Sequence, residues 1–400
     1  MNIDAHSAIV ILSVLVVLSY LFNYLAKQFR IPSVLLLISS GIGLKFAAGY
    51  FGFVVPSTKI LLEILGITGL IFIVLEAALD LKIERSKFSL IGRSFVSALI
   101  LLALTSGLIA WGFMIYFSIE FNQALLHAIP FSVISSAIAI PSVKNLEDDK
   151  REFIVYESTF SDILGIVLFN YVLFDQISGA GSILTFGKDI ILIVIISVIS
   201  TAFLVFLLSR TTSHVRFFLT FAILILAYSF AKSLHLPSLI LVLCFGIVVN
   251  NFNLFDYPLM RRYLSFDRLT EVTKEMKLMT AETAFIIRTF FFLLFGFSLN
   301  LSLVADKEVI LMGVGIIVVT LLVRFIFLQY VLKINSAPLA LIAPRGLITI
   351  LLFFTIPEDK RLVNLSEGLL FVVIGITGVM MMVGLLLNKQ RPEEKIEDLI

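Results

Sequence analysis

The chain has 400 residues, of which 60% are hydrophobic and only 14% are charged, and its mean hydropathy is +1.08. A soluble domain carries nearly twice that charged fraction, so the composition excludes a soluble protein and indicates lipid as the solvent. The net charge of +2 gives no sign of nucleic-acid binding, and the single cysteine, Cys244, excludes an internal disulfide.

The hydrophobic stretches predict thirteen membrane-spanning helices, each near the roughly 20 residues that a bilayer requires. We therefore expect an all-α, polytopic membrane protein in which residues 1–400 form one transmembrane unit ending in a short polar tail, 389–400. In chain order the spans cover residues 7–26, 32–50, 57–80, 91–118, 122–145, 152–175, 188–210, 215–233, 237–252, 274–299, 304–333, 337–356 and 364–388.

The basic residues of the loops predict the orientation, because cytoplasmic loops carry an excess of Lys and Arg. About twenty Lys and Arg lie in one set of connections and about seven in the other. The richer set includes Lys27, Arg85, Arg151, Arg261 and the tail. We therefore expect a cytoplasmic C-terminus and an outside N-terminus, in the inner membrane of a bacterium.

Two parts of the chain resemble each other. Residues 25–42 (LAKQFRIPSVLLLISSGI) match residues 230–247 (FAKSLHLPSLILVLCFGI), which lie 205 positions later, and residues 72–81 more weakly match residues 292–301. The stronger match relates spans 2 and 9, which are separated by an odd number of spans and so have opposite orientations.

This pattern predicts two inverted-topology repeats of six helices. The first covers about residues 7–175 and the second about residues 215–388, and a linking helix at 188–210 joins them. Inverted repeats surround one site near the midplane with two oppositely opening halves, which favours a transporter that works by alternating access.

Spans 5 and 12 occupy corresponding positions in the two repeats, and each contains a proline in mid-membrane. Pro141 follows Ile140 in span 5, and Pro344 precedes Arg345 and Gly346 in span 12. Proline removes a helix hydrogen bond, and glycine loosens the backbone. Broken helices at corresponding positions indicate a transport site, so we expect the breaks at these residues.

Span 6 carries the two acidic residues that we consider most informative, Glu157 and Asp162. They lie five positions apart, about 500° around a helix, and therefore point in different directions. Ser158 shares a face with Asp162, and Ser161 adds another oxygen ligand of the kind that suits a hard alkali cation. We expect Asp162, Ser161 and Ser158 to bind either a cation or a proton, with Ser136 of span 5 as a further oxygen donor.

Three arginines lie inside predicted spans, where each needs a partner because it keeps its charge. We expect Arg345 to form a structural ion pair with Glu157 that holds span 6 against span 12. Arg288 either pairs with Glu282 or extends toward the interface, and Arg324 has no recognisable motif. We keep Glu282, Arg288 and Arg324 as secondary candidates.

The chain resembles the monovalent cation:proton antiporter superfamily over nearly its whole length. Residues 157–162 (ESTFSD) are similar to the Glu-Ser-x-x-Asn-Asp motif of the electroneutral branch. Residues 344–346 are similar to its Arg-Gly motif in span 12, and residues 282–296 resemble its tenth span. Two positions depart from the pattern, because Ser161 replaces the Asn, and residues 139–141 (AIP) fall where the family has Thr-Asp-Pro.

The resemblance implies that Asp162 carries the ion and that Glu157 pairs with Arg345. It also implies that spans 4–6 and 11–13 form a moving core and that the remaining spans form a dimerisation domain. The acidic residue of the broken fifth span is missing at Ile140, so one carboxylate would have to serve both ions.

We therefore predict an antiporter that exchanges Na⁺ or K⁺ for H⁺ at Asp162, works as a homodimer in the lipid bilayer, and binds no nucleic acid. We expect no enzymatic activity, no cofactor, and no metal other than the transported cation. Two alternatives remain open: a uniporter or channel-like cation pathway on the same scaffold, and a degenerate protein that senses or scaffolds without transporting.

Overall fold

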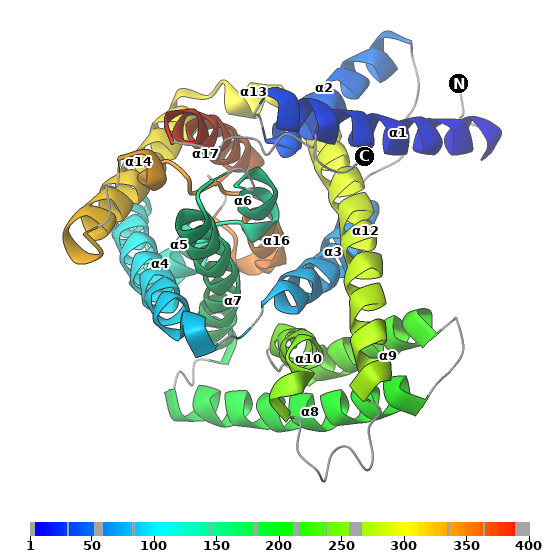
Figure 1. The fold of residues 1–400 in the computed structure, drawn as a ribbon. Coiled ribbons are helices and arrows are strands. Elements are labelled where there is room, and N and C mark those ends of the chain that lie inside the picture. The colour runs from blue at the N-terminus through cyan, green and yellow to red at the C-terminus, as the bar shows by residue number, and fades with distance from the viewer. Residues whose placement is uncertain are drawn as a thin grey trace.

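The computed structural model describes residues 5–388 apart from 30–31, 52–58, 82, 84, 144–145, 179–182, 211–215, 235, 237, 256–265, 334–336 and 363–364. The predicted tail, 389–400, lies outside the described residues. The described part is helical and contains no β-strand, which confirms the all-α class (Figure 1).

Each of the thirteen predicted spans corresponds to one helix or to a broken pair of helices. Among the described residues, six segments are long and apolar enough to cross a membrane, and further apolar helices are shorter, including α9 and α10. The helices are α1 (Ala5–Phe29), α2 (Ser33–Tyr50), α3 (Lys59–Asp80), α4 (Phe88–Phe117), α5 (Phe121–Ser132), α6 (Ser136–Ser142), α7 (Asp148–Ser178), α8 (Ile183–Arg210), α9 (Arg216–Ser233), α10 (Leu239–Asn250), α12 (Phe266–Ser298), α13 (Leu301–Val304), α14 (Lys307–Ile326), α15 (Ala337–Ala340), α16 (Leu347–Thr355) and α17 (Glu367–Leu387).

Local chemistry fixes several helix ends. The Asp306 carboxylate accepts a hydrogen bond from the Glu308 backbone N–H at 3.1 Å and so caps the start of α14. The far end of α14 continues into a π-helical turn, Phe327–Val331. Ser118 ends α4 in the left-handed backbone conformation, with φ at 54°.

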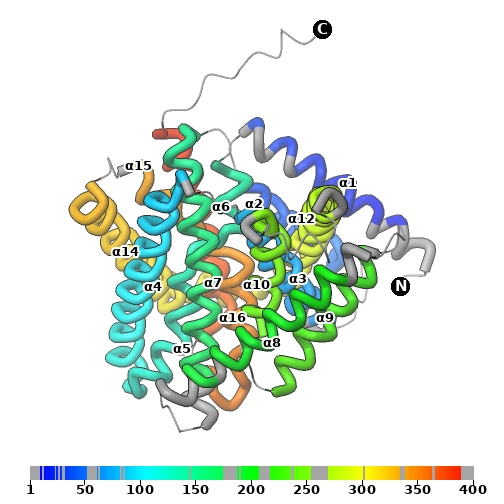
Figure 2. Tube along the Cα trace, turned by 60° about the horizontal axis from the view of Figure 1, so that its bottom comes forward, coloured from blue at the N-terminus to red at the C-terminus, as the bar shows by residue number. Residues whose placement is uncertain are grey.

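The helices form two groups that lie side by side (Figures 1 and 2). The first group, called the core group here, contains α4–α7 and α13–α17, and the second, called the scaffold group, contains α1–α3, α8–α10 and α12. In Figure 2, α4 and α14 mark one edge of the molecule, and α1 and α9 mark the opposite edge. The core group consists of predicted spans 4–6 and 11–13, which the family resemblance assigned to one domain.

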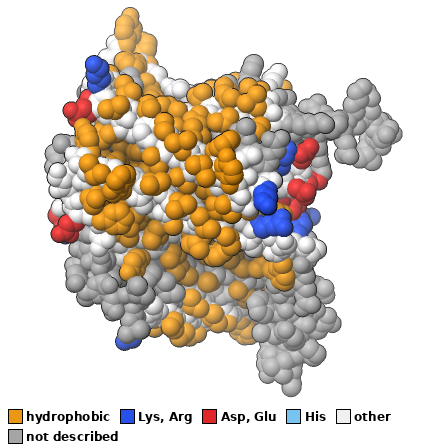
Figure 3. All heavy atoms as spheres, turned by 90° about the vertical axis from the view of Figure 1, so that its left-hand side faces the viewer, with side chains coloured by type: hydrophobic (Ala, Val, Ile, Leu, Met, Phe, Trp, Pro, Cys, Tyr) orange, Lys and Arg blue, Asp and Glu red, His pale blue; other side chains and the backbone are white. Residues whose placement is uncertain are grey.

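The outer side of the core group is apolar. Figure 3 shows this face covered by hydrophobic side chains, with charged side chains near its edges. Exposed apolar residues in water would favour association, whereas in a bilayer they contact lipid tails. Those on α4 and α14 include Trp111, Ile115, Leu311, Leu322 and Phe325.

The two helices that resemble each other in sequence, α2 and α10, each pack closely against a neighbouring helix. In both, the contact is made at a glycine that the two sequences share, Gly41 and Gly246. A Cβ at Gly41 of α2 would overlap the Leu293 carbonyl oxygen of α12, and one at Gly296 would overlap the Ile38 carbonyl oxygen. A Cβ at Gly246 of α10 would lie 2.5 Å from the Ala78 Cβ of α3. Thus α2 packs on α12 while α10 packs on α3, a reciprocal exchange of partners between the two halves of the chain. The inverted orientation and the repeat boundaries stay predictions.

We expect Gly41→Ala to destabilise the protein by about 1–3 kcal/mol, because the new methyl group overlaps backbone atoms that cannot move aside. Gly43→Ala, two positions along the same helix, is the matched control, because a Cβ there meets no atom within 4 Å. Thermal unfolding in detergent micelles measures both. Equal unfolding temperatures for the two variants would contradict the close crossing.

Candidate functional site

The fifth span is broken at residues 133–135, between α5 and α6. Three successive backbone N–H groups are left without helical partners there, and each finds one on another segment. Ile134 donates to the Ser161 hydroxyl oxygen at 2.9 Å, and Ser135 donates to the Pro344 carbonyl oxygen at 2.9 Å. Ser136 donates to the Asp162 carboxylate at 3.1 Å. Unpaired backbone groups are costly within a membrane. The contacts with α7 and with the break of the twelfth span therefore stabilise this break.

Asp162 is 4% exposed and lies directly against the break. Its Oδ2 accepts hydrogen bonds from both the backbone N–H and the hydroxyl group of Ser136. Its Oδ1 is buried and has no hydrogen-bond partner among the described residues, and the same is true of the Ser135 hydroxyl. A buried oxygen without a partner is unusual, so both atoms are candidates for binding an ion.

The twelfth span is broken at residues 341–346, between α15 and α16, as predicted at Pro344 and Gly346. The Arg345 N–H donates to the Thr377 hydroxyl oxygen at 3.1 Å, and the Gly346 N–H donates to the Thr349 hydroxyl oxygen at 3.4 Å. A Cβ at Gly346 would lie 2.8 Å from the Ser135 Oγ, so glycine permits the two breaks to touch.

Arg345 joins the two breaks through backbone carbonyl groups. Its Nε donates to the Phe131 carbonyl oxygen at 2.7 Å, and its Nη1 donates to the Ala343 carbonyl oxygen at 2.9 Å. A weaker contact of 3.5 Å joins its Nη2 to the Thr320 hydroxyl oxygen. Because Phe131 lies in the last turn of α5, the guanidinium satisfies a carbonyl at the negative end of that helix.

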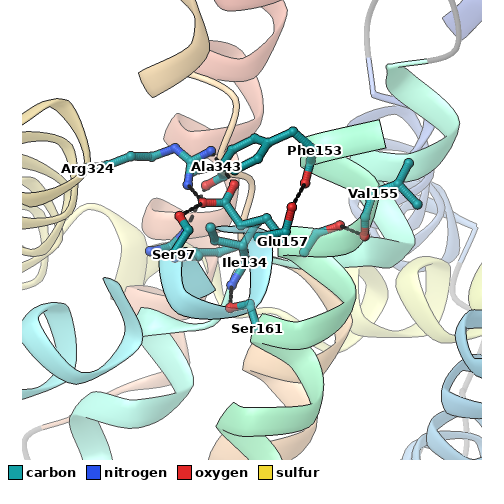
Figure 4. Close-up of polar contacts among 11 residues, drawn as sticks. Ser97, Ile134, Phe153, Val155, Glu157, Ser161, Arg324 and Ala343 are labelled. Carbon is teal, nitrogen blue, oxygen red and sulfur yellow. Dashed lines mark hydrogen bonds and ion pairs between the residues drawn. The ribbon is translucent and has the colours of Figure 1, made fainter. Parts of the chain in front are cut away.

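The predicted ion pair of Glu157 with Arg345 is wrong, because Glu157 binds Arg324 instead (Figure 4). The Arg324 Nη1 and Nη2 donate to the two carboxylate oxygens at 3.0 and 2.7 Å, and the Ser97 hydroxyl donates to one of them at 2.6 Å. Glu157 is 0% exposed and Arg324 is 2% exposed. The pair joins α7, α4 and α14 within the core group.

The other serines of span 6 have local partners. The Ser158 hydroxyl donates to the Val155 carbonyl oxygen of its own helix at 3.2 Å, and the Ser161 hydroxyl oxygen accepts the hydrogen bond from the Ile134 N–H. Ser161 therefore positions the break, and its expected role as an ion ligand stays a prediction together with that of Ser158.

The expected location of the first break, at Ile140 and Pro141, is also wrong. Both residues lie inside α6, and the break comes before Ser136. A proline needs no N–H partner and interrupts only the bond to the residue four positions earlier, so it can stay within a short helix. The polar residues at the break are therefore Ser135 and Ser136.

The remaining candidates lie in the scaffold group. Arg288 of α12 forms an ion pair with Glu76 of α3, with Nη1 at 3.2 Å from Oε2. The two expected alternatives for Arg288, a pair with Glu282 or a side chain extended toward the interface, are therefore wrong. Glu282 is exposed and accepts a hydrogen bond from the Tyr20 hydroxyl of α1 at 2.9 Å.

Only four charged side chains are buried within the described part of the chain: Glu157, Asp162, Arg324 and Arg345. All four lie in the core group. Glu157 balances Arg324 by direct contact, whereas Arg345 contacts neutral oxygens. An ionised Asp162 therefore leaves the buried charges balanced, and a neutralised Asp162 leaves one positive charge in excess.

The chain is similar to known proteins over nearly its whole length. The sequence model described as "Sodium/hydrogen exchanger, transmembrane" matches residues 12–389. The chain belongs to the sodium/hydrogen exchanger family. As a member it is an integral, multi-pass membrane transporter rather than an enzyme, and the family assignment supports cation/proton antiport.

Two solved structures have the same fold as this exchanger. One is the sodium proton antiporter MjNhaP1 from Methanocaldococcus jannaschii at pH 8, with a TM-score of 0.65, 20% identity, and 95% of each chain covered. The other, from a 3D EM map of that antiporter, has a TM-score of 0.65 and 20% identity and covers 96% of this chain and 95% of the other. No curated protein sequence matches the chain.

Proposed function

We propose that this exchanger carries Na⁺ against H⁺ and that both ions bind, one at a time, to Asp162. The observation that supports this proposal is that the Oδ1 of this buried carboxylate has no hydrogen-bond partner among the described residues. A proton can occupy that oxygen, and so can a cation, but the two exclude each other. One titrating group is therefore enough for exchange of one ion for the other.

The oxygen atoms around Asp162 suit a small monovalent cation. The Ser135 Oγ lacks a hydrogen-bond partner among the described residues, and the Ser136 hydroxyl already contacts the carboxylate. Alkali cations prefer such oxygen ligands, and water can complete the shell. We propose Ser135 and Ser136 as ligands in addition to Asp162.

The buried charges favour an electroneutral exchange. The site has the same charge with a bound proton as with a bound monovalent cation, since either ion by itself neutralises the Asp162 carboxylate. We propose that the core group, with both breaks, moves relative to the scaffold group to expose Asp162 to one side at a time. We further propose that the scaffold group forms the contact of a homodimer.

The test is a cation series in proteoliposomes that contain a pH-sensitive dye, with Na⁺, Li⁺ and K⁺ compared at one ionic strength. We expect a Na⁺ gradient to drive proton movement without a membrane potential. A flux that needs no proton gradient would favour a uniporter, and no flux with any cation would favour a protein that does not transport. Faster exchange with K⁺ than with Na⁺ would identify K⁺ as the substrate in place of Na⁺.

The serine ligands give a second expectation. Ser135→Ala should raise the Na⁺ concentration for half-maximal exchange about tenfold, because a lost ligand contact costs about 1–1.5 kcal/mol. Ser142→Ala of α6 is the matched control, because its hydroxyl donates to the Ile138 carbonyl oxygen of its own helix at 2.7 Å. Equal half-maximal Na⁺ concentrations in the two variants would show that Ser135 is not a ligand of the cation.

A further inference from the structure

A pocket of about 90 Å³ lies where the core and scaffold groups meet. Helices α7 and α16 line it from the core group, and α3, α9 and α10 line it from the scaffold group. Its polar lining residues are Asn170, Tyr228, Lys232, Ser238 and Thr355. The other eight lining residues have no polar side-chain group, so water or a cation in this space would contact these five side chains.

The pocket lies in line with Asp162 along α7. Phe169 lines the pocket and is seven positions after Asp162, so both side chains project from one face of α7 about 10 Å apart along its axis. Phe169 is 0% exposed, and Asp162 does not line the pocket. On α7 the pocket therefore reaches Phe169 and stops short of the carboxylate in this conformation.

Lys232 is the only charged residue among the described residues that line the pocket. It is exposed, lies in the last turn of α9, and forms no ion pair or hydrogen bond within the described part of the chain. Lys232 therefore places a positive charge beside this pocket that no described residue neutralises, and the apolar residues of the pocket wall strengthen its field. On the predicted orientation this end of α9 faces the outside.

We propose that Lys232 is a specificity-determining residue for the transported cation, which it selects by repelling cations that enter through this pocket. The inference rests on the proposed function, because it takes Asp162 as the destination. The repulsion energy is proportional to the charge of the ion, so it is twice as large for a divalent cation as for a monovalent one. The factor by which the lysine lowers the binding constant is therefore squared for a divalent cation. Lys232 thus weakens the binding of Ca²⁺ and Mg²⁺ more than it weakens the binding of Na⁺.

The test measures Na⁺-driven proton movement in proteoliposomes of the full chain, together with its inhibition by Ca²⁺. In Lys232→Gln we expect the half-maximal Na⁺ concentration to fall about threefold and the inhibitory Ca²⁺ concentration to fall about tenfold. Lys232→Glu should strengthen both effects, and Lys232→Arg should behave as the parent. Both effects should vanish in about 0.5 M N-methylglucamine chloride, because salt screens an exposed charge.

Lys307→Gln is the control, since Lys307 is an exposed lysine at the start of α14 and does not line the pocket. Parental Na⁺ and Ca²⁺ values in Lys232→Gln, or equal changes in Lys307→Gln, would overturn the inference and leave the proposed function standing. A parent protein that exchanges no cation would overturn the proposed function, and this inference with it.

Discussion

Asp162→Asn should reduce exchange at least about 100-fold, and no Na⁺ concentration should restore it. The amide can neither release a proton at working pH nor neutralise a cation. Losing the partner of a desolvated charge costs about 3 kcal/mol or more, and each 1.4 kcal/mol is tenfold in affinity. The measurement is the initial rate of Na⁺-driven proton movement in proteoliposomes of matched protein content.

Folding of this variant can be checked separately. The asparagine side-chain oxygen still accepts the hydrogen bond from the Ser136 N–H, so we expect an unfolding temperature close to that of the parent. Asp306→Asn is the matched control, because asparagine caps a helix as well as aspartate and Asp306 is exposed at the start of α14. Parental exchange in Asp162→Asn would disprove the role of this carboxylate.

The second large effect is expected at the buried Glu157–Arg324 pair. Glu157→Gln leaves the Arg324 guanidinium buried without a counter-charge, which should destabilise the protein by about 3–5 kcal/mol. We expect a lower unfolding temperature in detergent and a lower yield of folded protein. Because Asp162 and its break are held by other contacts, any variant that folds should retain exchange.

A double-mutant cycle distinguishes the two candidate partners of Glu157. Combining Glu157→Gln with Arg324→Met should cost about 2–3 kcal/mol less than the sum of the single changes. The same cycle with Arg345→Met should show a smaller coupling, because Arg345 donates to backbone carbonyls rather than to Glu157. A larger coupling with Arg345 would contradict the observed pairing.

Arg345 has a different part in this arrangement. It holds the carbonyl groups that both breaks leave free, and its charge balances that of Asp162 within the core group. The breaks are stabilised because side chains and one carbonyl group accept the hydrogen bonds that the helices no longer make: Ser161, Asp162 and Pro344 at one break, and Thr349 and Thr377 at the other. The same contacts place the carboxylate beside two hydroxyl groups.

The sequence alone was sufficient for the membrane class, the positions of the helices and the family. Each span needs about 20 apolar residues, so hydropathy marks it without knowledge of its neighbours. It also selected Asp162 as the candidate, because an acidic residue in the middle of such a span is expensive and rarely without function, and the role of Asp162 in exchange stays a proposal. The second break could be placed as well, since Pro344 and Gly346 both weaken the helix there.

Only the tertiary structure decided which groups contact each other. Arg324 and Arg345 are equally buried and lie far from Glu157 in the sequence, so the pairing depends on how α7 crosses α14 and the second break. Likewise, the first break comes before Ser136 rather than at Pro141. Its position depends on acceptors from α7 and the second break, and no local pattern in span 5 records them. Contacts between distant segments follow from helix packing, which a single sequence does not encode locally.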